Sequence, residues 1–446
     1  MFLQRIESPG LAHYSYVFGD RNEAAVIDPR RDIDDYLDAA ATETCAIRFV
    51  FETHRHEDFA VGSPALAERC GAEIWHADGD LDYGYGRAAA DGQSWRIGRL
   101  QLRAVATPGH TPGSMSYLLH DPEGNPWILF SGDTLFAGAV GRTDLLGPVR
   151  AQDLAGRLYD SIFSRLLTLG DGIILCPAHG AGSVCGGQIV ERPWTTLGLE
   201  RRANPRLQVK NREEFVVAAS QALERPPYFR RLERWNLAGP PPAEVSPPRP
   251  LTPAAFRREA REAQVLDIRE ETAFAAAHVP DSLYMPLSML PVYAGWFLDP
   301  DRPLLLVGED GAPLAAARHL FRLGFDSPRG FLAGGMLAWH QDGRDSRATG
   351  TITATAYAMI EEEVAGAAVL DVRSDEEVSR LGALPEALHI PLTRLLERLS
   401  EVPEKGPVYI FCGSGLRSLI ASSLLERAGC RQTLAVLGGT VGLSRV

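Results

Sequence analysis

The chain has 446 residues, which is too long for one compact core and corresponds to about two to four domains. Hydrophobic residues make up 45% of the sequence and charged residues 23%, as in ordinary globular proteins. The net charge of −12 argues against nucleic acid or an anionic membrane as a partner. Six scattered cysteines without a CxxC pair, and no run of about 18 apolar residues, predict a cytoplasmic protein without a membrane segment.

The N-terminal half alternates between two kinds of pattern. Short β-branched runs occupy residues 24–28, 48–53, 100–108 and 127–133, and helical patterns occupy 63–71 and 151–167. This alternation predicts a layered α/β domain, which we assign to residues 1–240.

Four segments of this domain carry metal-capable side chains beside glycine at the ends of apolar runs. A single such histidine is more often an ordinary surface or core residue, but four boxes in order favour a metal site. In the first box Phe59 stands where a further imidazole would complete a second metal site. The boxes are THRHEDF (53–59), TPGHTPGS (107–114), FSGDTLF (130–136) and CPAHGAGS (176–183).

The order and wording of the boxes resemble the metallo-β-lactamase superfamily over about residues 1–205. The resemblance implies an αββα sandwich with the metal ligands at one edge of its two sheets. Many members hold two metals, and the second would use Asp58, a histidine at position 59 and His179. Phe59 cannot coordinate a metal, so the resemblance implies one metal per chain.

Two further segments look like the persulfide dioxygenase branch of that superfamily. They are FSGDTLFAGAVGRTDL (130–145) and CPAHGAGSVCGG, the latter followed by TTLGLERRANPRL (195–207). In that branch one Fe(II) is held by the residues matching His54, His110 and Asp133. Two imidazoles and one carboxylate leave about three coordination positions open for O2 and substrate.

The same resemblance assigns roles around the metal. It places His56, Asp58 and His179 beside the site as residues that orient ligands, water or substrate without binding iron. It favours Arg142, in the segment GRTD, as a contact for an anionic persulfide. The alternative for Arg142 is a simple ion pair with Asp144.

A proline-rich stretch, GPPPAEVSPPRP, ends the first domain, and we expect a spacer at residues 241–250. Beyond it the sequence repeats. VLDIRE at 265–270 corresponds to VLDVRS at 369–374, and three further segments keep nearly the same offset. The repeat predicts two tandem domains, 251–346 and 351–446, each a parallel sheet with helices on both faces.

The second repeat contains an apolar strand that leads into the loop CGSGLRS and then a helical pattern. Such a turn gathers backbone amides and a helix N-terminus into a bowl that holds an anion and favours a thiolate. Cys412 is therefore a candidate nucleophile, with Arg417 as a fixed positive charge. The alternative is a small buried hydrophobic residue.

This repeat resembles the rhodanese family of sulfurtransferases over nearly all of 351–446. The matching residues are Asp371-Val372-Arg373, the segment LPEALHIPL, the loop from Cys412 to Arg417 and Leu437-Gly438-Gly439. The resemblance makes Cys412 the carrier of a persulfide. It makes the rest of the loop the substrate-binding cradle, formed by Gly413, Ser414, Gly415, Leu416 and Arg417.

The first repeat has the same sequence pattern but lacks the candidate nucleophile and the positive charge. Gly308 stands in the place of Cys412, and Pro313 in that of Arg417. We expect a catalytically silent rhodanese-like domain with an interface role.

These features together predict a non-haem Fe(II) persulfide dioxygenase coupled to a Cys412 sulfurtransferase. Its partners would be O2, sulfite or thiosulfate, and a thiol persulfide of the glutathione or coenzyme A type. We expect sulfide detoxification as the cellular role and a homo-oligomer as the assembly. The alternatives are a thioester hydrolase of the glyoxalase II type and a non-enzymatic sulfur-relay scaffold.

Overall fold

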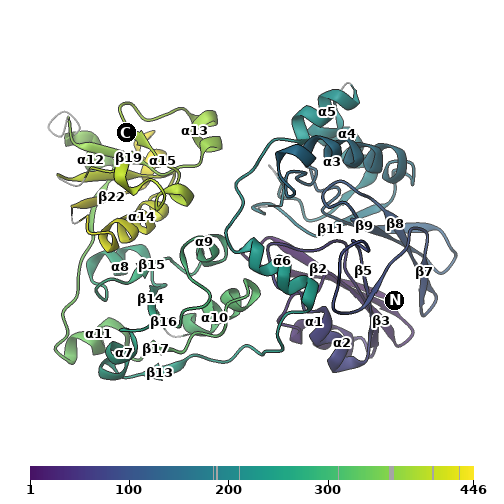
Figure 1. Ribbon diagram of the computed structural model, residues 1–446, viewed down its shortest axis with the longest axis horizontal. Helices are drawn as coiled ribbons and strands as arrows, with labels where there is room; N and C mark the ends of the chain where they lie inside the picture. Colours follow the sequence, from purple (N-terminus) through teal and green to yellow (C-terminus); the bar gives the residue numbers. More distant parts are fainter. Residues whose placement is uncertain are drawn as a thin grey trace. The chain divides into compact units, whose positions relative to one another are not determined.

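The computed structural model describes residues 1–183, 185–186, 189–209, 211–309, 311–360, 366–403, 406–430 and 432–445. It divides into two compact units, one of Met1–Glu244 with Phe321–Gly324 and one of Val245–Leu320 with Phe325–Val446 (Figure 1). The predicted domain 351–446 includes residues 361–365, 404, 405, 431 and 446, which lie outside the described residues, as does Asp310. Within the described ranges, every helix is too short or too polar to cross a membrane.

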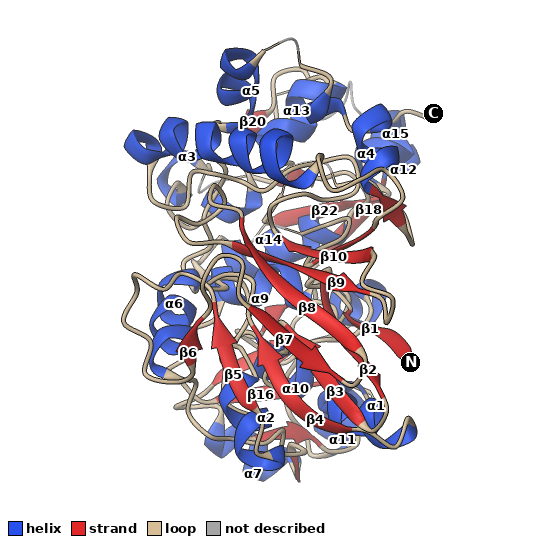
Figure 2. Ribbon diagram, turned by 90° about the vertical axis from the view of Figure 1, so that its right-hand side faces the viewer, coloured by secondary structure: helices blue, strands red, loops and turns tan. Residues whose placement is uncertain are grey.

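The first unit contains two six-stranded sheets, whose strands are visible in Figure 2. The first sheet has the order β1-β2-β3-β4-β5-β6, and the second has the order β12-β11-β10-β9-β8-β7. The first comprises β1 (Phe2–Ser8), β2 (His13–Asp20), β3 (Glu23–Ile27), β4 (Ala46–Phe51), β5 (Glu73–His76) and β6 (Arg87–Ala88). The second comprises β7 (Ser94–Ile97), β8 (Leu100–Ala106), β9 (Met115–His120), β10 (Pro126–Gly132), β11 (Ile174–Pro177) and β12 (Thr195–Thr196).

The alternation of side chains along these strands creates three apolar layers. On β2, Tyr16 and Phe18 point into the core between the two sheets, whereas Val17 packs under helices α1 and α2. On β10, Leu129 faces the other way, toward α3. The stacking is helix, sheet, sheet, helix, as predicted. The helical segments of this unit are α1 (Asp34–Thr42), α2 (Ser63–Cys70), α3 (Pro148–Asp160), η1 (Ser161–Leu166), α4 (Leu197–Ala203), η2 (Pro205–Leu207), α5 (Arg212–Ala219) and α6 (Phe229–Ala238).

The second unit contains two five-stranded sheets with identical topology. Their strand orders, β13-β17-β16-β14-β15 and β18-β22-β21-β19-β20, are the same pattern used twice, and every strand pair is parallel. The strands are β13 (Arg249–Leu251), β14 (Gln264–Asp267), β15 (Leu283–Tyr284), β16 (Leu304–Val307), β17 (Gly330–Leu332), β18 (Gly350–Thr353), β19 (Ala368–Asp371), β20 (Leu388–His389), β21 (Val408–Phe411) and β22 (Thr433–Leu437).

Helical segments lie between the strands of both rhodanese-like domains. The domain with β13 to β17 has α7 (Pro253–Glu259), α8 (Glu271–Ala276), α9 (Leu290–Phe297), α10 (Ala312–Arg322) and α11 (Gly335–Gln341). The second has α12 (Ala354–Ile360), α13 (Asp375–Leu381), η3 (Leu392–Arg394), η4 (Leu399–Glu401), α14 (Leu416–Arg427) and α15 (Gly439–Leu443). The internal sequence repeat therefore corresponds to a structural repeat.

Candidate metal centre and cysteine loop

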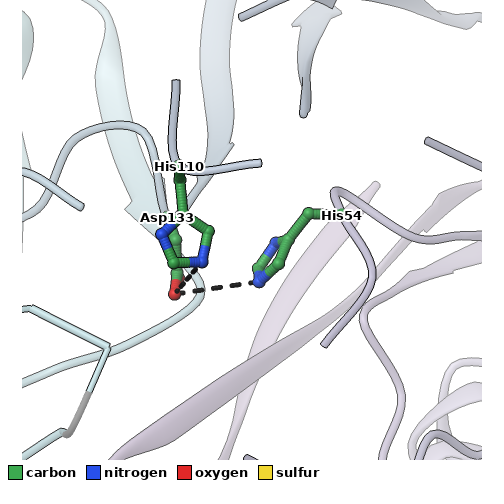
Figure 3. Close-up of side chains that lie close together, drawn as sticks. All are labelled: His54, His110 and Asp133. Carbon is green, nitrogen blue, oxygen red and sulfur yellow. Dashed lines mark ion pairs between the residues drawn. The ribbon is translucent and has the colours of Figure 1, made fainter. Parts of the chain in front are cut away.

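Three predicted metal ligands converge at the ends of strands from both sheets. His54 follows β4, His110 follows β8 and Asp133 follows β10, and each side chain is about 2% exposed or less. The Nε2 atoms of His54 and His110 lie 3.8 and 3.5 Å from Asp133 Oδ2 (Figure 3). These three ligand atoms lie within 4.8 Å of one another, as the donors of one metal ion do.

Hydrogen bonds fix which nitrogen of each histidine is free. The Nδ1 of His110 lies 2.9 Å from the carbonyl oxygen of Arg142, which only accepts, so Nδ1 carries the proton. The Thr53 hydroxyl donates to Asp28, so its contact with His54 Nδ1 at 2.9 Å requires that nitrogen to donate as well. Both Nε2 lone pairs are therefore left for a metal.

The charges at the centre also suit a cation. Burial lowers the pKa of both His54 and His110, so both rings are neutral. Burial acts against ionisation of Asp133, but the neighbouring His179 and its hydrogen bond lower the pKa of this carboxyl. Asp133 Oδ2 is buried and has no hydrogen-bond partner. An ionised, unpaired oxygen facing two bare nitrogens is costly without a cation, so the residues present fit a metal ion.

His179 lies between two carboxylates and does not join the three ligands. Its Nδ1 is 2.8 Å from Asp133 Oδ1, and its Nε2 is 2.9 Å from Asp58 Oδ2. Burial opposes protonation, but the two carboxylates raise the pKa of His179 well above its ordinary value. In this arrangement His179 bridges Asp133 and Asp58, and its ligand atom also lies within 4.8 Å of those of Asp58 and Cys185. Its role as a residue that orients Asp133 without binding metal stays a prediction.

His56 contacts Asp28 beside the metal centre. Its Nε2 lies 2.9 Å from Asp28 Oδ1. The two atoms are close enough for an ion pair, but their angles do not meet those of a hydrogen bond. Asp28 also accepts the backbone N–H of Thr53 at 2.7 Å and has a left-handed backbone, with φ of 50°. Strain of this kind recurs near functional sites, where surrounding contacts hold it in place.

Phe59 fills the position next to Asp58 with an apolar ring. It is 0% exposed, and its ring centroid lies 3.9 Å from that of His13 and 4.5 Å from that of His56. His13 pairs with His179 as an isolated bridge between backbone segments. An aromatic stack therefore occupies the space beside Asp58 and His179.

A small recess that includes His110 lies beside the centre. Its cavity volume is about 70 Å³. It is lined by Arg55, Glu57, Asp78, Asp80, Leu81, His110, Thr111, Pro112, Gly113, Leu145 and Leu146.

Arg142 does not line this recess. Its guanidinium is 2% exposed, and Nε and Nη2 bond to the Asp144 carboxylate at 2.7 and 2.8 Å. It also donates to the carbonyl oxygens of Leu223 and Glu224. Pairing with Asp144 is what the structure shows, and substrate placement by this side chain stays a prediction.

The cysteine loop forms the predicted turn between β21 and α14. The Gly415 amide donates to Cys412 Sγ at 3.0 Å, and α14 begins at the next residue. Gly415 has φ of 105°, a conformation that favours glycine and turns this amide toward the sulfur. The Cys412 side chain is 0% exposed.

The turn at Leu437-Gly438-Gly439 holds this loop from the other side. Gly438 N donates to Ser414 O at 3.0 Å, Thr440 N to Cys412 O at 2.8 Å and Val441 N to Gly413 O at 3.0 Å. A Cβ at Gly439 would lie 2.2 Å from the Cys412 oxygen, so only glycine allows this approach. The motif recognised in the sequence therefore anchors the loop backbone.

Arg417 points at a partner that sequence reasoning missed. Its Nη1 and Nη2 donate to both oxygens of Glu377 at 2.5 and 2.6 Å. Glu377 belongs to the capping box of α13, where it also accepts the Ser374 amide. The pattern Ser-Asp-Glu-Glu at 374–377 is typical of a helix start, but it gives no sign of the ion pair.

Two other residues near the metal centre were not predicted as site residues from the sequence. His13 and Thr53 are both buried there. His13 lies in a strand with no glycine or repeated box beside it, so nothing in the sequence distinguished it from a core residue.

Comparison with known proteins agrees with the fold. Residues 8–179 match the metallo-beta-lactamase superfamily, and residues 252–342 and 353–445 match the rhodanese-like domain. A crystal structure of a metallo-beta-lactamase from Staphylococcus aureus subsp. aureus COL covers 75% of this chain and 98% of its own, with a TM-score of 0.67 and 29% identity.

Curated relatives match the N-terminal half. The mitochondrial persulfide dioxygenase ETHE1 of Mus musculus is 30% identical over 236 residues, which are 51% of this chain and 84% of that protein. The hydroxyacylglutathione hydrolase GloC of Haemophilus influenzae is 26% identical over 219 residues, or 44% of this chain and 93% of that protein. The fold prediction is confirmed, and the chain belongs to the persulfide dioxygenase family of the metallo-beta-lactamase superfamily, in a form fused to two rhodanese-like domains.

Proposed function

We propose that the chain is an Fe(II)-dependent persulfide dioxygenase coupled to a sulfurtransferase. The observation that carries the proposal is the buried triad of His54, His110 and Asp133, with two bare nitrogens facing one unpaired carboxylate oxygen. Two imidazoles and one carboxylate form the donor set of non-haem Fe(II) oxygenases, so we propose one Fe(II) per chain. The family relationship supports the same reaction.

The chain's own residues would prepare the site for this chemistry. Bound Fe(II) would supply open positions for O2 and for the persulfide sulfur. Thr53 and the Arg142 carbonyl keep the two histidines in the tautomer that presents Nε2. His179 holds Asp133 by a charged hydrogen bond, and Phe59 keeps the neighbouring volume apolar. The persulfide would enter by the recess beside His110.

The overall reaction needs only O2 and water besides the substrate. A thiol persulfide, RSSH, reacts with O2 and H2O to give the thiol RSH, sulfite and two protons. The sulfane sulfur is oxidised and O2 is reduced. We propose a low-molecular-weight thiol of the glutathione or coenzyme A type, since the recess beside His110 is partly open to solvent and is lined by both polar and apolar side chains.

Cys412 would then exchange sulfane sulfur with sulfite. A Cys412 persulfide and sulfite give the Cys412 thiolate and thiosulfate, and the reverse step consumes thiosulfate to load the cysteine. The amide of Gly415 on Sγ and the loop anchored by Gly438 support this role. Two linked activities keep a reactive intermediate at high local concentration, which suits sulfide detoxification. Six free cysteines support a reducing, cytoplasmic setting, and self-association stays an expectation.

A thioester hydrolase is the rival function, because GloC is also a relative. The test is O2 uptake by the anaerobically purified full chain, supplied with glutathione persulfide or with a glutathione thioester. We expect uptake with the persulfide alone, loss of about a hundredfold or more in His110→Ala, and wild-type uptake in Cys412→Ser. Thioester hydrolysis without O2 uptake, or full uptake in His110→Ala, would show that the proposal is wrong.

A further inference from the structure

Helix α6 carries a buried asparagine on the face that its pattern reserves for apolar residues. The helix (Phe229–Ala238) belongs to the first unit and precedes the proline-rich stretch (Figure 1). Its buried residues are Phe229, Leu232 and Asn236, which lie at positions i, i+3 and i+7 of one helix face. Asn236 is 1% exposed. Asparagine is a poor helix former and is costly to bury without hydrogen bonds, so its place on this face requires partners.

Both ends of the Asn236 side-chain amide bond to one loop. The Nδ2 group donates to the carbonyl oxygens of His56 and Phe59, each at 2.8 Å. The Oδ1 atom accepts the backbone N–H of Val61 at 3.0 Å. Because a carbonyl oxygen only accepts and a backbone N–H only donates, this orientation of the amide is the one that satisfies all three partners.

The loop that Asn236 holds carries the first metal box. It joins β4, which ends at Phe51, to α2, which begins at Ser63, and it contains His54 and Asp58. Residues 52–62 are all described, and they form no helix and no strand beyond an isolated bridge at Val61. Buried N–H and C=O groups in such a stretch need partners from elsewhere in the chain. The side chain of Asn236 alone supplies three of them.

A second hydrogen bond from the same segment holds the backbone at Asp58. Tyr228, which immediately precedes α6, donates its hydroxyl to the Asp58 carbonyl oxygen at 3.2 Å. This carbonyl lies between the two that Asn236 holds. The Asp58 carboxylate then contacts His179 Nε2 at 2.9 Å, and His179 Nδ1 contacts Asp133 at 2.8 Å. A continuous series of polar contacts therefore links α6 to one of the three metal ligands.

We propose that Asn236 is a positioning residue for the metal centre, which holds this loop so that His54 and Asp58 keep the directions that metal binding requires. The inference rests on the proposed metal role of His54, His110 and Asp133, and it adds a residue that does not touch the metal. Its three bonds fix the backbone from which these side chains extend. Partners outside the ligand set commonly change metal affinity by about 10-fold to 100-fold.

The test is the affinity of the full chain for Fe(II), measured without oxygen by competition with a chelator, in Asn236→Asp and Leu232→Ala. Asn236→Asp keeps the shape of the side chain and an acceptor for Val61 but loses both donors. Leu232→Ala truncates a fully buried side chain on the same face of α6 and leaves the three bonds in place, so it controls for a general loosening of the helix. We expect Asn236→Asp to bind iron about tenfold or more weakly and Leu232→Ala to bind it like the wild type.

Asn236→Ala is the second variant, in case a buried carboxylate prevents folding. It leaves space in which water can meet the freed carbonyl oxygens without fixing the loop, and we expect the same loss of affinity. Wild-type affinity in either Asn236 variant, or an equal loss in Leu232→Ala, would overturn the inference.

His110→Ala separates this inference from the proposed function. Undiminished iron affinity in His110→Ala would refute the metal centre itself. A loss in His110→Ala together with wild-type affinity in the Asn236 variants would refute only the role of Asn236.

Discussion

The ring of Phe59 packs on the imidazole of His13, with centroids 3.9 Å apart. This contact joins the loop after β4 to strand β2 directly beside Asp58 and His179. It places an apolar ring at position 59, where the resemblance to two-metal members of the superfamily would put a nitrogen ligand. The prediction of a single metal therefore depends on Phe59, whose side chain cannot coordinate a metal.

Replacing Phe59 with histidine should change the number of metals bound. Asp58, the new imidazole and His179 would form a second donor set, with Asp133 between the two. We expect Phe59→His to bind more than one metal per chain and to lose O2 uptake. Phe59→Leu, the control, should keep one metal. Metal analysis of both variants after dialysis is the measurement, and one metal in Phe59→His would contradict the explanation.

Thr53 should control metal affinity without touching the metal. Its hydroxyl links His54 Nδ1 to Asp28, and Thr53→Val removes the acceptor that fixes this tautomer. We expect metal affinity to fall by about 10-fold to 100-fold, because such outer hydrogen bonds orient the ligand. Competition with a chelator measures this. Thr42→Val, on the exposed face of α1, serves as control; an equal affinity in the two variants would refute the role of Thr53.

Lowering the pH should destabilise the rhodanese-like domain that contains Cys412, through Glu377. Burial opposes ionisation, but hydrogen bonds from Arg417 and the Ser374 amide lower the pKa of Glu377 from 4.5 to about 2. A carboxyl group whose pKa is lowered in the folded state stabilises that state at pH values above its pKa in the unfolded chain. This stabilisation is lost as the pH falls from about 4.5 to 2.

Glu377→Gln should remove this pH-dependent contribution. We expect the variant to be about 1–3 kcal/mol less stable at pH 7 and to approach the wild type near pH 2. Calorimetric unfolding across this pH range is the measurement. The exposed Glu397→Gln is the matched control, and a constant gap between Glu377→Gln and wild type at all pH values would contradict the prediction.

A cysteine at Gly308 should not restore activity to the silent domain. A Cβ at this position would lie 2.9 Å from two carbon atoms of Ile268, so the side chain of Ile268 occupies the space. Pro313 also supplies no positive charge for a sulfur anion. We expect Gly308→Cys in a Cys412→Ser background to transfer no sulfur from thiosulfate to cyanide. Recovered transfer would show that the missing thiol alone silences the domain.

Most of the fold could be predicted from the sequence because short, local sequence patterns determine its strands and helices. The predicted β runs at 24–28, 48–53, 100–108 and 127–133 correspond to β3, β4, β8 and β10. The repeated VLD segments predicted two tandem domains with parallel sheets, and these domains share one topology. Glycine-bearing boxes marked the strand ends, where His54, His110 and Asp133 meet. These features follow from backbone geometry, which short sequence patterns encode well.

The contacts of the site residues could not be predicted from the sequence, because their partners come from distant segments of the chain. His13 reaches Phe59 across 46 positions of the chain (59 − 13), and Arg417 reaches Glu377 across 40. Such contacts depend on how elements pack, and no short motif records them.

Iron content distinguishes a single iron held by His54, His110 and Asp133 from other arrangements. The full chain, purified without oxygen from iron-replete cells, should contain one iron per chain, and Asp133→Asn should contain almost none. The substitution keeps the shape of the side chain but removes the charge that faces His54 and His110. Two metals per wild-type chain, or undiminished iron in Asp133→Asn, would contradict a single iron held by this triad.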